Sequence, residues 1–369
     1  MPFSDAERQE IAVNCHKYLG YRPTHSFAER MRAIADSKFA AMRLDHYGNG
    51  GFITEFEREI ADLFGKEAAV FMPSGTMAQQ IALRIWCDQA GNNHIAFHPK
   101  SHLEMYEQGA YRELHHLSAS LLGDPDRLFN LEDLQAIPEK IAALLIELPQ
   151  REIGGQLPTW EALSDICGWA RSQEIKVHMD GARLWECQPF YGREYREICS
   201  LFDSVYVSFY KILGGLPGAM LAGPTDFVSE ARVWLRRHGG NLHTLAPNAI
   251  AGKLGMENQL SKIPEYSARC AEIATALHGI EGLKVVPENP PTNMMHWHFT
   301  GDKDRIENAL YEVAQETGIL LFRSLTATEK PGVWMVEVTI ADRSMELSAN
   351  EVQAAVVDVM ERATGLPSR

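Results

Sequence analysis

The sequence predicts an α/β protein that has a large domain with a mainly parallel sheet covered by helices, plus a small C-terminal α+β domain. Two observations predict this fold class. Between residues 68 and 223, short apolar runs of strand length alternate with longer stretches that carry helical patterns. After residue 293, the order changes to strand, helix, strand, strand and helix. Strands that are joined by long helices pair in parallel, and the helices then cover both faces of the sheet.

Six apolar runs are the expected strands of the large domain. They are 68–72 (AAVFM), 94–98 (HIAFH), 142–149 (AALLIELP), 176–179 (KVHM), 203–209 (DSVYVSF) and 218–223 (GAMLAG). A helix is expected at 77–89, and another at 159–173, where Trp160, Leu163 and Ile166 recur at helical spacing. Such sheets bind ligands beyond the carboxyl ends of their strands, so we expect a site in the loops that follow these strands.

The C-terminal third of the chain looks like a second unit. A helical stretch from about 225 to 279 leads to it, and the Pro- and Asn-rich stretch 282–293 is typical of a boundary. We assign residues 1–40 to an N-terminal helical segment, 41–260 to the large domain and 261–369 to the small C-terminal domain.

Composition limits the classes of partner. The 369-residue chain has a net charge of −14, from 35 Lys and Arg against 49 Asp and Glu, which argues against nucleic acid or an anionic membrane. The six cysteines are scattered without a zinc or C-x-x-C spacing, as in reduced cytosolic proteins. The N-terminus lacks the apolar core of a signal peptide, and no apolar run reaches the ~18–20 residues of a membrane span. We expect a soluble, cytoplasmic protein.

Two of the loops after predicted strands carry groups suited to binding. Ser74-Gly75-Thr76 offers two hydroxyls and the free N–H groups of a helix start, which together can hold a phosphate. The same three residues are also an ordinary helix cap. His102, in the loop after strand 94–98, is a candidate catalytic residue or a structural histidine near a helix start.

Two further loops carry charged groups. In "KVHMDGARLWE" a strand ends on Asp180, and Arg183 follows three residues later; the simplest interpretation is an ion pair that caps a helix. Lys211 ends the next strand and precedes a Gly-rich turn. A lysine at such a place is usually solvated, but one that is partly buried is a good amine nucleophile.

A metal site is not expected. His296 and His298 lie on one face of a predicted strand, but no third ligand is evident, which favours packing over metal binding. The sequence also lacks the phosphate-loop, H-E-x-x-H and G-x-S-x-G motifs.

The four loops together fit one cofactor, pyridoxal 5′-phosphate (PLP). This cofactor needs a lysine that bonds to its aldehyde carbon, a carboxylate that keeps its pyridine nitrogen protonated, a phosphate cradle and a flat group against its ring. The sequence supplies these as Lys211, Asp180, Ser74-Gly75-Thr76 and His102, in that order, with Arg183 near enough to serve the phenolic oxygen or a substrate carboxylate.

Three stretches resemble the threonine aldolase branch of the β-eliminating lyase family. They are 47–79 (YGNGGFITEFEREIADLFGKEAAVFMPSGTMAQ), 178–185 (HMDGARLW) and 208–223 (SFYKILGGLPGAMLAG). The resemblance implies PLP fold type I, the fold of aspartate aminotransferase. It also implies that Lys211 bonds the cofactor, Asp180 contacts the pyridine nitrogen, His102 stacks on the ring and Ser74-Gly75-Thr76 binds the phosphate.

The chain departs from the family pattern around the substrate. The stretch 16–23 (HKYLGYRP) lacks the R-S-D-T of family aldolases, and 336–340 (VEVTI) replaces their R-x-V-T-H. Where they have E-N-T-H, with a histidine by the substrate hydroxyl, this chain reads 147–150 (ELPQ). Tyr210 replaces the usual serine before the lysine. The cofactor site is therefore kept, while the substrate site differs.

These departures leave the substrate carboxylate without its usual partners. Arg151, at the end of a strand expected to face the cofactor, is one candidate ligand, and Arg183 is the other. The alternative for Arg151 is a simple pair with Glu152 or solvent. By resemblance, Tyr47 belongs to a segment that borders a neighbouring subunit's active site, which implies a homodimer or homotetramer with active sites near the subunit interface.

The resemblance implies a PLP-dependent lyase that acts on a small amino acid. We expect retro-aldol cleavage of a β-hydroxy-α-amino acid to glycine and an aldehyde, with His102, or water held by it, as the base, because Gln150 cannot take a proton. A β-eliminating C–S or C–O lyase, with Lys211 taking the Cα proton, is the alternative. Racemisation and transamination share the first step. A PLP-fold protein that binds ligand without turnover is the remaining interpretation.

Overall fold

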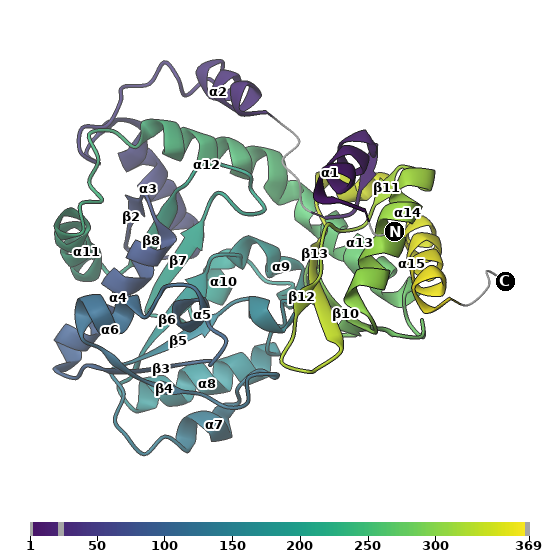
Figure 1. Ribbon diagram of the computed structural model, residues 1–369. Coiled ribbons are helices and arrows are strands. Elements are labelled where there is room, and N and C mark those ends of the chain that lie inside the picture. Colours follow the sequence, from purple (N-terminus) through teal and green to yellow (C-terminus); the bar gives the residue numbers. More distant parts are fainter. Residues whose placement is uncertain (1–2, 21–25, 366–369) are drawn as a thin grey trace. The chain divides into compact units, whose positions relative to one another are not determined.

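The computed structural model describes residues 3–20 and 26–365, and it divides the chain into two compact units (Figure 1). The large unit consists of the described part of His25–Glu152, together with Leu157–Ser261. The small unit consists of the described parts of Met1–Thr24 and Lys262–Arg369, together with Ile153–Gln156.

A seven-stranded sheet forms the centre of the large unit. Its strand order is β2 (Ala68–Met72), β8 (Ala219–Gly223), β7 (Ser204–Ser208), β6 (Lys176–Gly181), β5 (Ala143–Glu147), β3 (His94–Phe97) and β4 (Ser118–Leu121). Only β8 runs opposite to the other six strands, so the mainly parallel sheet that the sequence predicts is confirmed. Every residue of β5, β7 and β8 is buried, as expected for strands covered on both faces.

The large unit also contains the following helices and short helical turns, of which η1 and η3 each end in a residue of the small unit. They are α2 (Phe27–Ala35), α3 (Gly51–Phe64), α4 (Gly75–Ala90), α5 (His102–Met105), α6 (Ala110–His115), α7 (Leu131–Gln135), η1 (Arg151–Ile153), α8 (Trp160–Ser172), η2 (Leu184–Glu186), α9 (Gln188–Tyr191), α10 (Tyr195–Cys199), α11 (Thr225–Arg237), α12 (Ala246–Gln259) and η3 (Leu260–Lys262). The periodicity of 159–173 is confirmed: α8 buries Leu163 and Ile166, and Thr159 caps its start.

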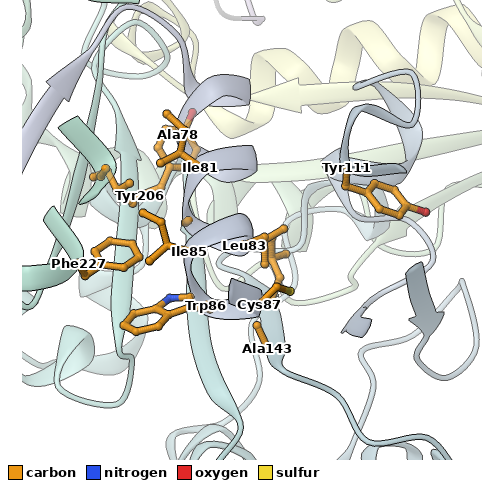
Figure 2. Packing of buried hydrophobic residues seen from close by; sticks show 14 of the residues in the cluster. Ala78, Ile81, Leu83, Ile85, Trp86, Cys87, Tyr111, Ala143, Tyr206 and Phe227 are labelled. Carbon is orange, nitrogen blue, oxygen red and sulfur yellow. The ribbon is translucent and has the colours of Figure 1, made fainter. Parts of the chain in front are cut away.

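Helix α4 carries much of the core and fixes the position of the loop before it. Figure 2 shows Ala78, Ile81 and Ile85 on the side of α4 that faces Tyr206 and Phe227. Trp86 stacks on Phe227 with ring centroids 4.5 Å apart. Because α4 contacts strands β2, β3, β5, β6, β7 and β8, its first turn is held rigidly over the sheet.

The small unit is built on an antiparallel sheet in the order β12 (Thr326–Ala327), β13 (Val333–Thr339), β10 (Met294–Thr300) and β9 (Leu283–Val286). Its other elements are α1 (Asp5–Asn14), α13 (Ile263–Ala276), α14 (Lys303–Thr317), η4 (Asp342–Glu346), α15 (Ala349–Thr364) and a parallel pair of β1 (Lys17–Tyr18) and β11 (Ile319–Leu320). The small α+β unit is thus confirmed. The stretch 282–293, interpreted from its prolines as a boundary, contains β9 and lies inside this unit.

In the described part of the chain, no helix is long and apolar enough to cross a membrane. Among the same residues, no three His, Cys, Asp or Glu side chains are grouped so that they could hold a metal ion.

Candidate active site

Three adjacent parallel strands end side by side at the centre of the large sheet. In their register, Glu147 of β5 pairs with Asp180 of β6, and Asp180 pairs with Tyr206 of β7. Side chains that are paired in this way leave the sheet on the same face. The carboxyl ends of β5, β6 and β7 therefore place two buried carboxyl groups and one buried phenol in a row.

The start of α4 lies over this row. Ser74 is the N-cap of α4, and its hydroxyl accepts a hydrogen bond from the Met77 N–H at 3.4 Å. Thr76 is exposed on the first turn, where helix N–H groups lack partners within the helix. A Cβ at position 75 would lie 1.9 Å from the Tyr206 hydroxyl oxygen, so only glycine permits this approach of helix and sheet. The predicted cradle and the ordinary cap are therefore both present.

Asp180 is buried and influences several neighbours. Its Oδ1 accepts a hydrogen bond from the Ala182 N–H at 3.1 Å. The short helix that follows begins at Leu184 with Arg183 at its N-cap and no side-chain capping bond, so the predicted Asp180 cap of a helix near Ala182 is not formed. The negative charge of Asp180 acts to raise the pKa values of five titratable groups around it, although burial and positive charges lower that of Lys211 overall. These groups are His102, Glu147, Tyr206, Tyr210 and Lys211. These groups therefore lie within electrostatic range of one carboxylate.

Lys211 lies three residues beyond the end of β7, in the loop rather than in the strand. Burial lowers the pKa of its amine to about 8, and the positive charge of Arg183 acts in the same direction. Asp180 and Glu147 oppose this shift. At neutral pH, such an amine is neutral and nucleophilic in a much larger fraction of molecules than an ordinary lysine.

His102 begins α5 and is held at two points. Its backbone N–H donates to Glu147 Oε2 at 3.0 Å, and its ring Nδ1 lies 3.2 Å from Glu107 Oε1. The hydrogen bond to Glu107 raises the pKa of the His102 imidazole, while burial opposes that rise. The ring also lies against Tyr106, with centroids 5.3 Å apart.

Glu147 connects the two loops that flank the lysine. It accepts hydrogen bonds from the N–H groups of His102, at 3.0 Å, and Arg151, at 3.3 Å. The Gln150 amide donates to Glu147 at 3.4 Å and to the Lys100 carbonyl at 2.9 Å. Burial, together with the negative charge of Asp180, raises the pKa of the Glu147 carboxyl to about 7.

Arg151 has the local partner that was predicted as the alternative to substrate binding. Its Nη1 lies 2.6 Å from Glu152 Oε1, and its guanidinium lies 5.5 Å from the centre of the Tyr106 ring. The Tyr106 hydroxyl donates to the same Glu152 oxygen at 2.9 Å. The charge of Arg151 nevertheless contributes to lowering the pKa of Lys211, which places the guanidinium within electrostatic range of the amine.

The remaining candidate, Tyr47, contacts the segment around His243. Its N–H donates to the His243 carbonyl at 2.9 Å, and its exposed ring meets the rings of His46 and His243 edge-on. The neighbouring Asp45 carboxylate caps the start of α12 by accepting from the Ala246 N–H at 3.0 Å. The expected contact of Tyr47 with a second subunit stays a prediction.

Sequence reasoning missed several residues of the cluster. Glu107, Glu147 and Tyr206 were not singled out as functional, although all three are buried. Glu147 could have been found, because it is a carboxyl group that ends a wholly apolar strand. Glu107 and Tyr206 gave no comparable signal, because their roles depend on partners in α4 that lie far away in the sequence.

The cluster and the fold together define a class of protein. An anion can bind at the start of α4, a protonated ring nitrogen at Asp180 and an aldehyde carbon at Lys211, with an imidazole close by. This set, on a mainly parallel sheet with a small α+β unit, is that of PLP enzymes of fold type I. Comparison with known proteins then supplies the family. The chain belongs to the β-eliminating lyase family, whose model matches residues 24–300.

Individual relatives agree with this assignment. A Listeria monocytogenes structure, provisionally described as an L-allo-threonine aldolase, is 40% identical, with a TM-score of 0.92, over 96% of this chain and 99% of that one. An Exiguobacterium structure, provisionally described as an aromatic amino acid β-eliminating lyase/threonine aldolase, is 37% identical with a TM-score of 0.91, again over 96% and 99%. The low specificity L-threonine aldolase of Escherichia coli K12 is 28% identical over 69% of this chain and 76% of its own length.

Proposed function

We propose that this protein cleaves a β-hydroxy-α-amino acid of the threonine type to glycine and an aldehyde, with PLP as its cofactor. The observation that carries the proposal is the meeting of Lys211, Asp180 and His102 around the carboxyl ends of β5, β6 and β7. The threonine aldolases among the relatives support retro-aldol cleavage over the other reactions of PLP enzymes.

The described residues fit this cofactor. Ser74, Gly75 and Thr76 would hold the phosphate at the start of α4, where Gly75 permits close packing on Tyr206. Asp180 would hold the ring nitrogen, and Lys211 would bond the aldehyde carbon. When bound, PLP supplies an electron sink for the pair released at the substrate Cα. The protein's part is to hold and orient the groups and to move protons.

The substrate carboxylate needs a cationic partner, and two arginines are available. Arg183 follows the Asp180 strand directly, and its charge acts on Lys211. Arg151 is already positioned by Glu152 and by the Tyr106 ring, which would present one edge of its planar guanidinium in a fixed direction. We propose Arg151 as the carboxylate ligand and Arg183 as a contact of the cofactor or of the substrate.

The base that takes the hydroxyl proton is His102. Gln150 occupies the position where family aldolases carry a histidine, and its amide donates to Lys100 and Glu147 and has no basic nitrogen. The imidazole of His102 is partly open, with 36% of its side chain exposed, and its hydrogen bond with Glu107 raises its pKa. A base with these properties fits proton abstraction at physiological pH.

One observation favours a second reaction. With a pKa of about 8, the Lys211 amine is also suited to remove the Cα proton, which would lead to loss of a β substituent from cysteine or serine derivatives. The two reactions give different products: glycine with an aldehyde from cleavage, and pyruvate with ammonia from elimination. Product analysis with threonine, allo-threonine, serine and cysteine tests the proposal, and pyruvate as the main product would contradict it.

The assembly and location are also proposals. We propose a homodimer, or a tetramer of such dimers, with Tyr47 at the border between subunits; the exposed ring cluster of His46, Tyr47 and His243 supports this. We propose a cytoplasmic location because all six cysteines are buried thiols rather than disulfides, as in proteins of a reducing compartment.

A further inference from the structure

Glu107, a carboxyl group with only 6% of its surface exposed, raises the pKa of His102, but the proposed reaction does not yet say which imidazole nitrogen it acts on. Glu107 follows α5 and lies between two side chains from different parts of the large unit. Its Oε1 lies 3.2 Å from Nδ1 of His102. Its Oε2 accepts a hydrogen bond from the Gln80 amide of α4 at 2.6 Å. A carboxyl group buried between two nitrogen atoms needs an explanation, because burial of a charge is expensive unless the charge is fully paired.

The contact with Gln80 makes Oε2 of Glu107 a hydrogen-bond acceptor, because the N–H₂ group of the amide faces the carboxyl group at 2.6 Å. Within the described residues, the other end of that amide, Oε1, is buried without a hydrogen-bond partner. The amide therefore gives up one bond in order to donate to Glu107. This arrangement fits a carboxylate that accepts at both oxygens.

An ionised Glu107 determines where the imidazole proton lies. A carboxylate only accepts hydrogen bonds, so Nδ1 of His102 must carry the proton in the 3.2 Å contact. In the neutral imidazole, Nε2 then has the free lone pair. The opposite end of the residue is fixed by Glu147, which accepts from the His102 backbone N–H. One carboxyl group therefore holds the backbone of His102 and another orients its ring.

Other groups that act on the imidazole do not choose between its nitrogens. Burial lowers the pKa of His102, the negative charge of Asp180 raises it and the positive charge of Lys211 lowers it. The hydrogen bond with Glu107 has the largest effect on this pKa, and it is a direct bond to one ring nitrogen.

We propose that Glu107, held by Gln80, is the positioning residue that keeps Nδ1 of His102 protonated and so leaves Nε2 to take the proton of the substrate hydroxyl. The inference rests on the proposed function. In the step, the substrate O–H bond breaks and an Nε2–H bond forms. The oxygen pair becomes the second bond of the aldehyde carbonyl, and the Cα–Cβ pair is left on Cα, next to the electron sink that bound PLP would supply. Glu107 balances the charge of the doubly protonated ring until the proton is given up to water.

The alternative role for Glu107 is structural, as a link between α4 and the turn after α5. The variant Glu107→Gln distinguishes the structural role from the positioning role. In that variant, an amide oxygen can still accept from Gln80, so the link survives. The amide N–H₂ then faces Nδ1 of His102, which must become an acceptor, and the ring proton moves to Nε2.

The test is nitrogen-15 NMR of the histidine rings in the apoenzyme, with His102→Gln used to assign the signal among the 14 histidines. The wild type should show His102 with the proton on Nδ1 in its neutral form, and Glu107→Gln should move it to Nε2 and lower its pKa. Glu113→Gln, an exposed residue of α6, is the control and should change neither. A wild-type ring protonated on Nε2, or a His102 titration unchanged in Glu107→Gln, overturns the inference without needing any variant to be active.

Steady-state kinetics of the same variant provide a second test. Cleavage of threonine at neutral pH should fall by about 10²-fold in Glu107→Gln, the contribution of a positioned general base, and the acid limb of kcat/KM should move to lower pH. The PLP dissociation constant should stay within about twofold. That change is much smaller than the about 1.4 kcal/mol of a tenfold change in affinity. Equal kcat values would contradict the positioning role. A wild type that binds PLP but cleaves no β-hydroxy amino acid would instead refute the proposed function, while the NMR result still decides this inference.

Discussion

Replacing Gly75 with alanine tests how tightly α4 is packed on the sheet. In a helix, Gly→Ala normally stabilises by about 0.5–1 kcal/mol. At position 75, however, the new Cβ would lie 1.9 Å from the Tyr206 hydroxyl oxygen and 2.5 Å from its ring carbon Cζ. Ordinary contact begins at 3.4 Å, so the helix start or the buried ring has to move by more than an ångström. Overpacking of this kind typically costs about 1–3 kcal/mol, which exceeds the gain. We therefore expect net destabilisation of about 1–2 kcal/mol.

The movement should also reach the cofactor, because Ser74 and Thr76 flank the substituted residue. Urea unfolding of the apoenzyme measures the first effect, and titration with PLP the second, which should be weakened. Gly168→Ala is the matched control: Gly168 is exposed in α8 and its Cβ would meet nothing within 4 Å, so that variant should be as stable as the wild type or more so. If Gly75→Ala unfolds at the same urea concentration and binds PLP equally well, the packing argument fails.

Four other predictions concern the site and the assembly. Lys211→Ala should lose the visible absorption band of lysine-bound PLP and at least ~10²-fold of activity; a variant with normal turnover would exclude Lys211. Arg151→Lys should weaken glycine binding by ~2–3 kcal/mol, the scale of a lost charge-assisted hydrogen bond, with the PLP spectrum unchanged; equal glycine dissociation constants would transfer the role to Arg183. Folding raises the pKa of Glu147 from its ordinary 4.5 to about 7, so its contribution to stability is complete below pH 4.5 and is lost as pH rises through 7. Glu147→Gln should remove that loss from the urea stability of the apoenzyme, and an unchanged pH dependence would count against the buried carboxyl. Light scattering should show a homodimer or larger at dilute concentration, with an interface above ~2,000 Å²; an active monomer would refute this.

Much of the fold could be predicted because its strands are short, apolar and separated by helices. The run 68–72 is predicted with its observed bounds, and those at 204–208 and 219–223 within one residue at each end. Strand β4 was missed, because Ser118–Leu121 is polar, and no residue in it is buried. Strand β9 was missed because the prolines after it suggested a domain boundary.

The candidate site likewise contains residues that the sequence reveals and residues that it does not reveal. Asp180 and Lys211 could be found because parallel strands bring their carboxyl ends to one edge, and a charged residue after a buried strand is visible in the sequence. Glu107 could not be found, because its role depends on Gln80, which lies 27 residues earlier, in α4. The importance of Gly75 likewise depends on Tyr206, which the sequence does not connect with it. Periodicity predicts the elements, whereas contacts of this kind depend on how α4 lies over the sheet.

The central claim is that the cluster at the ends of β5, β6 and β7 holds PLP on Lys211. The most direct measurement is to reconstitute the protein with PLP, reduce the bond with borohydride and locate the modified lysine by peptide mass spectrometry. We predict a single phosphopyridoxyl group, on Lys211, that does not form in Lys211→Ala. Stable modification of a different lysine, or no modification of protein that has bound PLP, would contradict the account.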